Sequence, residues 1–76
     1  MEITLGQRIA RWRAIASLRP TDLARRVGVK PSTVWEWENG DCNPSYDSLE
    51  KIARACGVEL RTFFGTVPDV PDKAAG

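Results

Sequence analysis

Residues 20–39 have the sequence PTDLARRVGVKPSTVWEWEN, in which two short helical patterns are separated by a glycine. Each pattern begins with a proline, which suits the first position of a helix because that position needs no N–H donor. Gly28 stands at the end of the first pattern and is expected to adopt a left-handed backbone conformation. The segment therefore predicts two helices, over residues 20–27 and 31–39, that are joined by a tight turn.

Helical patterns also flank this motif, and their ends carry recognisable residues. Thr4 and Gln7 form a capping-box pattern at the start of a helix that is expected to end near Ser17. Ser45 is expected to cap a fourth helix, and Gly57 to close it. A short fifth helix should follow directly. No alternating pattern typical of a strand competes with these helices.

Apolar residues recur every three or four positions in these segments, as expected for helices that bury one face. The side chains predicted to face inward are Leu5, Ile9, Trp12, Ala16, Leu23, Ala24, Val27, Val34, Trp37, Leu49, Ile52, Ala53 and Cys56. We therefore expect an all-α fold with one domain over residues 1–65. Residues 66–76 contain two prolines and several small side chains, so they are expected to form a flexible tail.

The composition limits the range of functions. No apolar stretch approaches the roughly 20 residues that span a bilayer, so we expect no membrane segment and a cytoplasmic protein. The chain has no histidine, and its two cysteines, Cys42 and Cys56, lack the spacing of metal ligands. We expect both cysteines to be reduced thiols, and we expect no cofactor. No nucleophile–base pair can be assembled from the sequence, so an enzyme is not expected.

Charge is distributed unevenly along the chain. Residues 1–30 hold seven cationic and two anionic side chains, which gives this part a net charge of +5. Residues 31–76 hold four cationic and eight anionic side chains, which gives a net charge of −4. Such an asymmetry suggests that one face of the molecule suits an anionic partner.

Several short segments occur in a fixed order along most of the chain. They are Leu23-Ala24-Arg25-Arg26-Val27-Gly28-Val29, Trp37-Glu38-Asn39-Gly40, Pro44-Ser45, and residues 49–58 followed by Phe63-Phe64. With these segments, residues 5–64 resemble the phage repressor/Cro (Xre-type) helix-turn-helix family. The resemblance implies a five-helix, lambda-repressor-like domain whose helix over residues 31–39 enters the major groove of double-stranded DNA. It also implies a mostly buried ion pair between Arg13 and Glu38, which would fix how that helix leans on the first helix.

The same resemblance implies which side chains touch DNA. Base contacts are expected from the exposed side of helix 31–39, with Trp35 adjacent to Pro31, Ser32, Thr33 and Glu36. Phosphate contacts are expected from Arg19, Lys30, Thr21, Arg11, Arg25 and Asn39. Two of these cations, Arg19 and Lys30, stand at the N-cap positions of the motif helices, where each costs about 0.5–1 kcal/mol. A phosphate bound at each helix start would offset this cost. The other interpretation is that both side chains are solvated cations on the surface.

Some residues depart from the pattern of the family. Arg, Lys, Gln and Asn read purines best, and none of them occurs in helix 31–39 before Asn39. Pro20 stands where the family has a glutamine that contacts phosphate, and Asp41 begins a loop that is often basic. Trp35 allows three interpretations: contact with sugar and thymine methyl in the groove, an anchor for a protein partner, or packing over arginines of the first helix.

We predict a sequence-specific DNA-binding transcriptional regulator, acting as a repressor and encoded by a bacterium or phage. The alternative is a protein-interaction module on the same fold, antitoxin-like or paired with another regulator, with weak or no DNA binding. Three side chains on the expected DNA face favour this alternative: Trp35, Glu36 and Asp41.

The resemblance also implies a homodimer with two-fold symmetry on DNA, its half-sites about 34 Å apart along the duplex. The matching dimer surface consists of Leu60, Phe64 and Val67. The alternative is that Phe64 only completes the core of the monomer.

Overall fold

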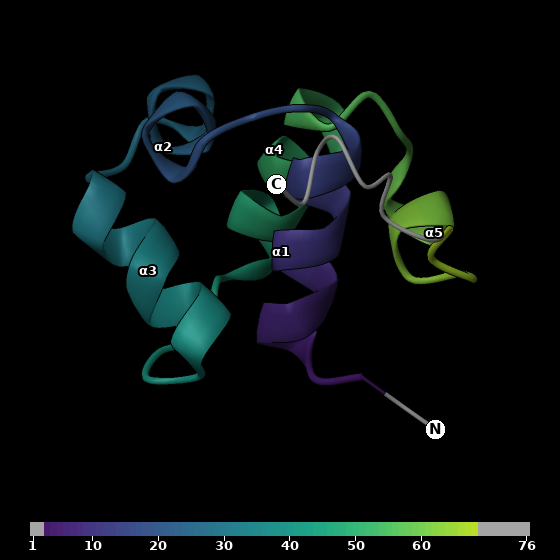
Figure 1. The fold of residues 1–76 in the computed structure, drawn as a ribbon, viewed down its shortest axis with the longest axis horizontal. Helices are drawn as coiled ribbons and strands as arrows, with labels where there is room; N and C mark the ends of the chain where they lie inside the picture. The colour runs from purple at the N-terminus through teal and green to yellow at the C-terminus, as the bar shows by residue number, and fades with distance from the viewer. Residues whose placement is uncertain (1–2, 69–76) are drawn as a thin grey trace.

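The computed structural model describes residues 3–68, which form five α-helices and no strand. The helices are α1 (Leu5–Ile15), α2 (Pro20–Val27), α3 (Pro31–Asn39), α4 (Tyr46–Ala55) and α5 (Leu60–Phe63). In Figure 1, α1 stands in the middle of the view, with α2 and α3 on one side of it and α5 on the other. The expected all-α architecture of five helices is confirmed.

Two helices begin with a side-chain cap, as the sequence predicts. At the start of α1, the Thr4 hydroxyl accepts from the Gln7 N–H at 3.1 Å, and the Gln7 side chain accepts from the Thr4 N–H at 2.9 Å. At the start of α4, the Ser45 hydroxyl accepts from the Ser48 N–H at 3.2 Å. These contacts satisfy N–H groups that have no partner within a helix, so they define where each helix begins.

The end of α1 lies earlier than expected. The helix ends at Ile15, two residues before Ser17, because Ser17 adopts a left-handed conformation with a φ of 59°. The Ser17 N–H donates to the Ala14 carbonyl, and the Leu18 N–H donates to the Arg13 carbonyl at 3.0 Å. This pair of hydrogen bonds is the Schellman motif, which turns a chain out of a helix. Glycine usually occupies the left-handed position, so a serine there gives no signal in the sequence.

The turn between α2 and α3 has the conformation that the sequence predicts. Gly28 has a φ of 88°, and the N–H groups of Gly28 and Val29 both donate to the Ala24 carbonyl, at 2.8 and 2.9 Å. A Cβ placed on Gly28 would meet no atom within 4 Å, so the backbone conformation alone requires glycine here. The bounds of α2 and α3 agree with the predicted ones.

Ten buried apolar side chains, contributed by all five helices, form one core. They are Ile9, Trp12, Leu23, Ala24, Val27, Val34, Trp37, Ile52, Ala53 and Phe63. Four side chains predicted to face inward are only half-buried: Leu5, Leu49 and Cys56 pack against the edge of this core, and Ala16 follows the end of α1. No polar side chain of the described residues is buried in it, so the core contacts of the motif helices with α1 and α4 are apolar packing contacts.

The short helix α5 is attached to α1 by two side chains. The Trp12 indole N–H and the Arg8 guanidinium both donate to the Phe63 carbonyl at 2.9 Å, and Arg8 also donates to the Gly65 carbonyl at 2.7 Å. Trp12 and Phe63 stack, with 6.4 Å between their ring centroids. Four residues are too few for a stable isolated helix, so these contacts fix α5 in place.

The longest helix in residues 3–68 has 11 residues, and none has the length and apolar character needed to cross a bilayer. Residues 69–76 of the expected tail lie outside the described residues. Val67 is half-buried and packs against the core.

Candidate nucleic-acid interface

An ion pair fixes the end of α3 against α1. Arg13 Nε donates to Glu38 Oε2 at 2.7 Å, and Arg13 Nη2 donates to Glu38 Oε1 at 3.0 Å. Arg13 Nη1 donates to the Leu18 carbonyl at 3.0 Å, so one guanidinium joins α1, the turn before α2, and α3. The two side chains are only 20% and 15% exposed. Two parallel, charge-assisted hydrogen bonds with little solvent around them hold the geometry tightly.

A close backbone approach fixes the same two helices near the start of α1. A Cβ placed on Gly6 would lie 2.5 Å from the Glu38 carbonyl oxygen and 2.6 Å from the Trp37 carbonyl oxygen. Real Cβ atoms do not come this close to backbone, so only glycine allows α3 to lie against α1 at this distance. Gly6 and Arg13 are seven residues apart, about two helical turns, and therefore lie on one side of α1.

Helix geometry decides which side chains of α3 face outward. Val34 and Trp37 are buried and Glu38 points to α1, so the opposite side of the helix is free. At about 100° per residue, this free side carries four exposed side chains. We call them the outer face of α3: Ser32, Trp35, Glu36 and Asn39. Asn39, expected at a phosphate, thus shares one surface with three expected base contacts.

The two remaining expected base contacts lie at the edges of this surface. Thr33 is half-buried, and it lies about 200° around the helix axis from Trp35. Pro31 is exposed in the first turn of α3. The structure therefore does not bring Thr33 together with the other side chains of the outer face.

The starts of α2 and α3 differ, although a cation stands at both. The Asp22 carboxylate accepts from the Arg19 backbone N–H at 2.9 Å and from Arg19 Nε at 3.1 Å. These hydrogen bonds lower the pKa of the Asp22 carboxyl below its ordinary value. Asp22 also places a negative charge at the positive end of α2, so the energetic cost expected at Arg19 is offset. Lys30 has no such partner in residues 3–68.

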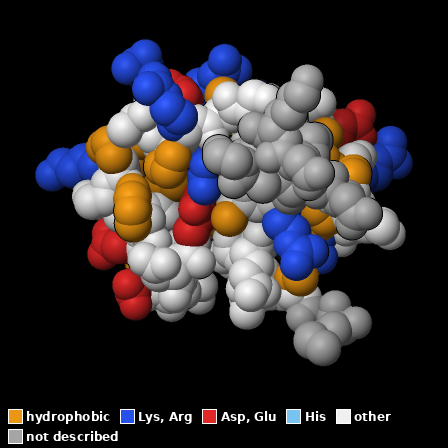
Figure 2. Space-filling view, viewed as in Figure 1, with side chains coloured by type: hydrophobic (Ala, Val, Ile, Leu, Met, Phe, Trp, Pro, Cys, Tyr) orange, Lys and Arg blue, Asp and Glu red, His pale blue; other side chains and the backbone are white. Residues whose placement is uncertain are grey.

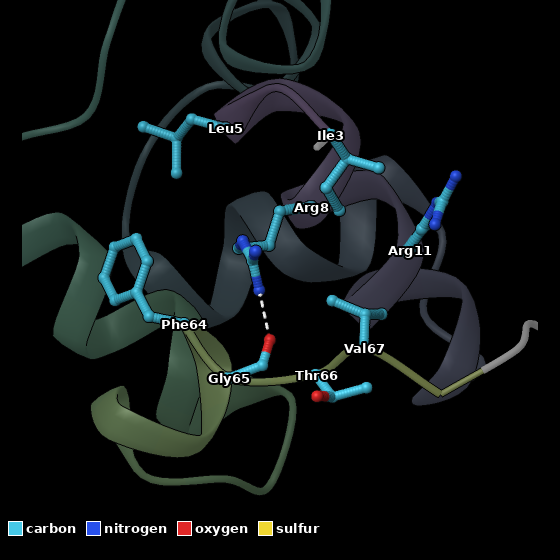
Figure 3. Close-up of a pocket in the computed structure, with 8 residues that line it drawn as sticks. All are labelled: Ile3, Leu5, Arg8, Arg11, Phe64, Gly65, Thr66 and Val67. Carbon is cyan, nitrogen blue, oxygen red and sulfur yellow. Dashed lines mark hydrogen bonds between the residues drawn. The ribbon is translucent and has the colours of Figure 1, made fainter. Parts of the chain in front are cut away.

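The other expected phosphate contacts lie in different places. Thr21 and Arg25 are both exposed, and their spacing of four residues puts them on one side of α2. Arg11 is exposed but lies about 200° around α1 from Arg13, so it points away from α3. Arg11 lines a hollow beside Val67 instead (Figure 3).

The charges around α3 form a gradient. Figure 2 shows Lys and Arg side chains over α2 and beside the start of α3, hydrophobic groups over the first half of α3, and acidic groups toward its end. The acidic groups exposed in this region of the chain are Glu36 and Asp41. Ion pairs within residues 3–68 engage Arg13, Arg19 and Arg61, so Lys30 and Arg25 keep unpaired charges.

Trp35 is 61% exposed, so most of its indole contacts no protein atom. The one cation–π contact within residues 3–68 joins Arg8 to Phe64, with 5.9 Å from the guanidinium carbon to the ring centroid. Packing of Trp35 over arginines of the first helix is therefore wrong. The reason is geometric, since the arginine of α1 that faces α3 is Arg13, which Glu38 engages.

On the far side of α1, a surface hollow lies between α1 and the chain that follows α5 (Figure 3). Its lining residues are Ile3, Leu5, Arg8, Arg11, Phe64, Gly65, Thr66 and Val67. Phe64 is 47% exposed, so it does not simply complete the core. Leu60 is half-buried in a separate depression beside Val58, so the expected dimer residues do not share one hollow.

Sequence reasoning missed the role of Arg8. In Figure 3 its guanidinium points to the Gly65 carbonyl, which lies 2.7 Å away. A signal was available, because Arg8 falls at helical spacing between Leu5 and Trp12 on the apolar side of α1. A cation within an apolar stripe indicates a structural partner, here the carbonyls after α5.

The family model of the helix-turn-helix domain matches residues 4–62. The chain belongs to the helix-turn-helix family. This domain is 29% identical to the N-terminal DNA binding domain of SinR from Bacillus subtilis, with a TM-score of 0.71 over 86% of this chain and 96% of that one. It also superimposes on the DNA-binding domain of the phage P22 C2 repressor with a TM-score of 0.76, at 24% identity over 93% and 92% of the two chains. The lambda-repressor-like fold is thereby confirmed.

Curated relatives extend across several kingdoms. The helix-turn-helix domain is 34% identical over 61 residues to multiprotein-bridging factor 1 of Eremothecium gossypii. These aligned residues cover 80% of this chain and 40% of that protein. It is 42% identical over 41 residues to an uncharacterized HTH-type transcriptional regulator of Haemophilus influenzae, covering 54% of this chain and 17% of that protein. The chain thus spans about two fifths or less of the length of these relatives.

Proposed function

We propose that this helix-turn-helix domain binds double-stranded DNA in the major groove and regulates transcription by occupying an operator. The observation that carries the proposal is the outer face of α3, which is exposed along the helix while Arg13, Glu38 and Gly6 hold its inner side against α1. A rigidly held, exposed helix is what groove recognition needs. The activity is binding and requires no chemical step.

Charge supports DNA as the partner. Lys30 stands at the start of α3 with no acidic partner in residues 3–68, and Arg25 is exposed on α2. Backbone N–H groups at a helix start favour an anion, and a nearby lysine adds to that preference. We assign phosphate contacts to Lys30, Arg25 and Thr21, and the groove contacts to the outer face of α3. The SinR domain, 29% identical to this one, is named as DNA-binding, which supports DNA as the partner.

A protein-interaction module is the second candidate, and the exposure of Trp35 favours it. A large aromatic side chain that is 61% exposed is typical of an interface anchor. Glu36 and Asp41 lie nearby in the sequence and would repel phosphates. On this interpretation, the outer face of α3 binds another protein.

Titration of a labelled random-sequence duplex at increasing salt separates the two candidates. A domain that clamps phosphates loses affinity steeply as salt rises. The logarithm of the affinity falls linearly with the logarithm of the salt concentration, with a slope of about −0.9 for each phosphate engaged. Lys30→Ala should weaken binding to all sequences alike and reduce that slope by about one. Lys51→Ala is the matched control, because Lys51 is an exposed lysine on α4, outside the proposed interface. Absence of binding at low salt would favour the protein partner.

We further propose that two copies associate through the hollow around Phe64 and Val67 when bound to a two-fold operator. The half-exposed phenyl ring and the surrounding apolar side chains of Leu5 and Ile3 support this surface. Sedimentation of the DNA complex tests it. Phe64→Ser should convert a complex of two copies into a complex of one, without unfolding the domain. Retention of two copies would exclude this surface.

The relatives include fungal, mammalian, archaeal and bacterial proteins, so the expected origin in a bacterium or phage stays a prediction.

A further inference from the structure

The outer face of α3 has an unusual composition for a surface that reads bases. Its four side chains are an indole, a carboxylate, a hydroxyl and an amide, with no arginine or lysine among them. Trp35 and Glu36 are adjacent, and both are exposed. Together they present an apolar ring beside a group that only accepts hydrogen bonds at neutral pH.

The major-groove edges of the bases differ in what they offer such a surface. Guanine presents two acceptors, N7 and O6, which a carboxylate repels and which the apolar face of an indole ring, unlike its N–H edge, leaves unsatisfied. Thymine presents a C5-methyl group, and cytosine presents an N4 amino donor. The pair formed by Trp35 and Glu36 therefore complements pyrimidine edges and not guanine.

We propose that Trp35 determines specificity by packing its exposed indole against the C5-methyl group of a pyrimidine in the major groove. This inference rests on the proposed DNA-binding function and assigns the chemistry of its readout. Ser32 and Asn39 lie three residues before and four residues after Trp35, so the ring stays within the surface that follows the groove. The neighbouring Glu36 accepts from an amino group at the adjoining edge and disfavours guanine there.

The test uses a duplex selected from a random pool by the wild-type domain. Each thymine is replaced in turn by uracil, which pairs identically but lacks the C5-methyl group. We expect affinity to fall about fourfold at one or two positions, which is the effect of losing one buried methyl group. At those positions, a duplex with 5-methylcytosine should bind more tightly than the same duplex with cytosine, by a similar factor. This second comparison isolates the methyl group from the identity of the base.

Variants assign the effect to the indole. Trp35→Ala should bind the thymine and uracil duplexes equally, whereas Trp35→Phe should keep part of the preference. Tyr46→Ala is the matched control, because Tyr46 is a 66% exposed aromatic residue outside the outer face of α3 and its loss should leave the preference intact. Circular dichroism confirms that the variants fold.

Two results would overturn the inference and leave the proposed function standing: equal affinity for thymine and uracil at every position of a specifically bound duplex, or an unchanged preference in Trp35→Ala. If no duplex is selected from the pool, the proposed function fails and the inference fails with it.

Discussion

Arg13 engages both carboxylate oxygens of Glu38, at 2.7 and 3.0 Å, and with its third nitrogen holds the Leu18 carbonyl. The guanidinium thus uses two nitrogens to hold the end of α3 and the third to hold the turn before α2. Removal of either charged partner leaves the other half-buried and without its counter-charge. The pair therefore sets the orientation of α3 more than it adds stability relative to an apolar alternative.

Loss of one partner of this pair should be costly. We expect Glu38→Ala and Arg13→Ala each to lower the free energy of unfolding by about 2–3 kcal/mol, because a hydrogen-bonded charge is left without its partner. The double variant Arg13→Met/Glu38→Leu should recover much of the loss, since apolar residues of similar size can replace such pairs. Urea denaturation of the wild-type domain, the two alanine variants and Arg13→Ala/Glu38→Ala measures the coupling. Additive losses would show that the two side chains act independently.

Gly6→Ala should destabilise the domain although it replaces glycine by a better helix former. The added Cβ would lie 2.5 Å from the Glu38 carbonyl oxygen, so α1 and α3 must move apart. Overpacking of this kind costs about 1–3 kcal/mol, whereas the intrinsic gain in α1 is only about 0.5–1 kcal/mol. Thermal unfolding shows whether the substitution lowers or raises the stability of the domain. A higher melting temperature would contradict the close approach.

Ser17→Gly should stabilise the domain by up to about 1 kcal/mol. A left-handed conformation costs a serine about 1–2 kcal/mol, and glycine avoids that cost while losing more backbone entropy on folding. Ser17→Val should lower stability, because a β-branched residue tolerates a φ of 59° poorly. Chemical denaturation of both variants provides the comparison. The prediction is wrong if the two substitutions shift stability in the same direction.

Asp22 should titrate at a lower pH than an ordinary aspartate. Hydrogen bonds from Arg19 lower the pKa of the Asp22 carboxyl in the folded domain below its ordinary value. The ionised carboxylate therefore contributes to stability at neutral pH. That contribution should fade as the pH falls through the lowered pKa. Nuclear magnetic resonance of the Asp22 carboxyl measures the titration directly. Arg19→Ala should move the midpoint upward, and an unchanged midpoint would show that the guanidinium is not engaged in solution.

The two thiols should differ in reactivity. Burial raises the pKa of the Cys56 thiol to about 11, whereas Cys42 is exposed in the loop after α3. Since the thiolate is the reactive species, iodoacetamide at pH 8 should modify Cys42 and leave Cys56 largely intact in the folded domain. Mass spectrometry after a timed exposure measures the fraction of each cysteine that is modified. In urea the two thiols should react at comparable rates, so equal reactivity in buffer would contradict the burial of Cys56.

Local signals in the sequence were sufficient for most of the fold. The prolines before α2 and α3, the left-handed Gly28 and the caps at Thr4 and Ser45 act over a few residues, and the helix bounds follow from them. The end of α1 was missed because Ser17 adopts a conformation that its residue type does not announce.

The candidate interface was harder to predict, because it depends on how helices pack. The inward positions of Val34 and Trp37 were predictable, but the expected contacts do not follow that rotation. Thr33, expected at a base, is half-buried, and Asn39, expected at a phosphate, lies on the outer face of α3. The family resemblance predicts a phosphate contact for Arg11, but two residues of helical rotation turn it to the opposite side of α1 from Arg13. The ion pair of Arg19 with Asp22 also depends on side-chain conformations that residue order leaves open.

The contacts of α1 set a fixed distance between two surfaces of the domain. Gly6 and Arg13 fix α3 to one side of it, while Arg8 and Trp12 fix the carbonyls at the end of α5 to another. A single rod about 16 Å long thus carries both the groove-facing helix and the surface around Phe64. If two copies meet at Phe64, the spacing between their α3 helices is determined by these rods and not by flexible chain. Operators with half-sites one base pair too near or too far would then have to be bent or twisted to fit.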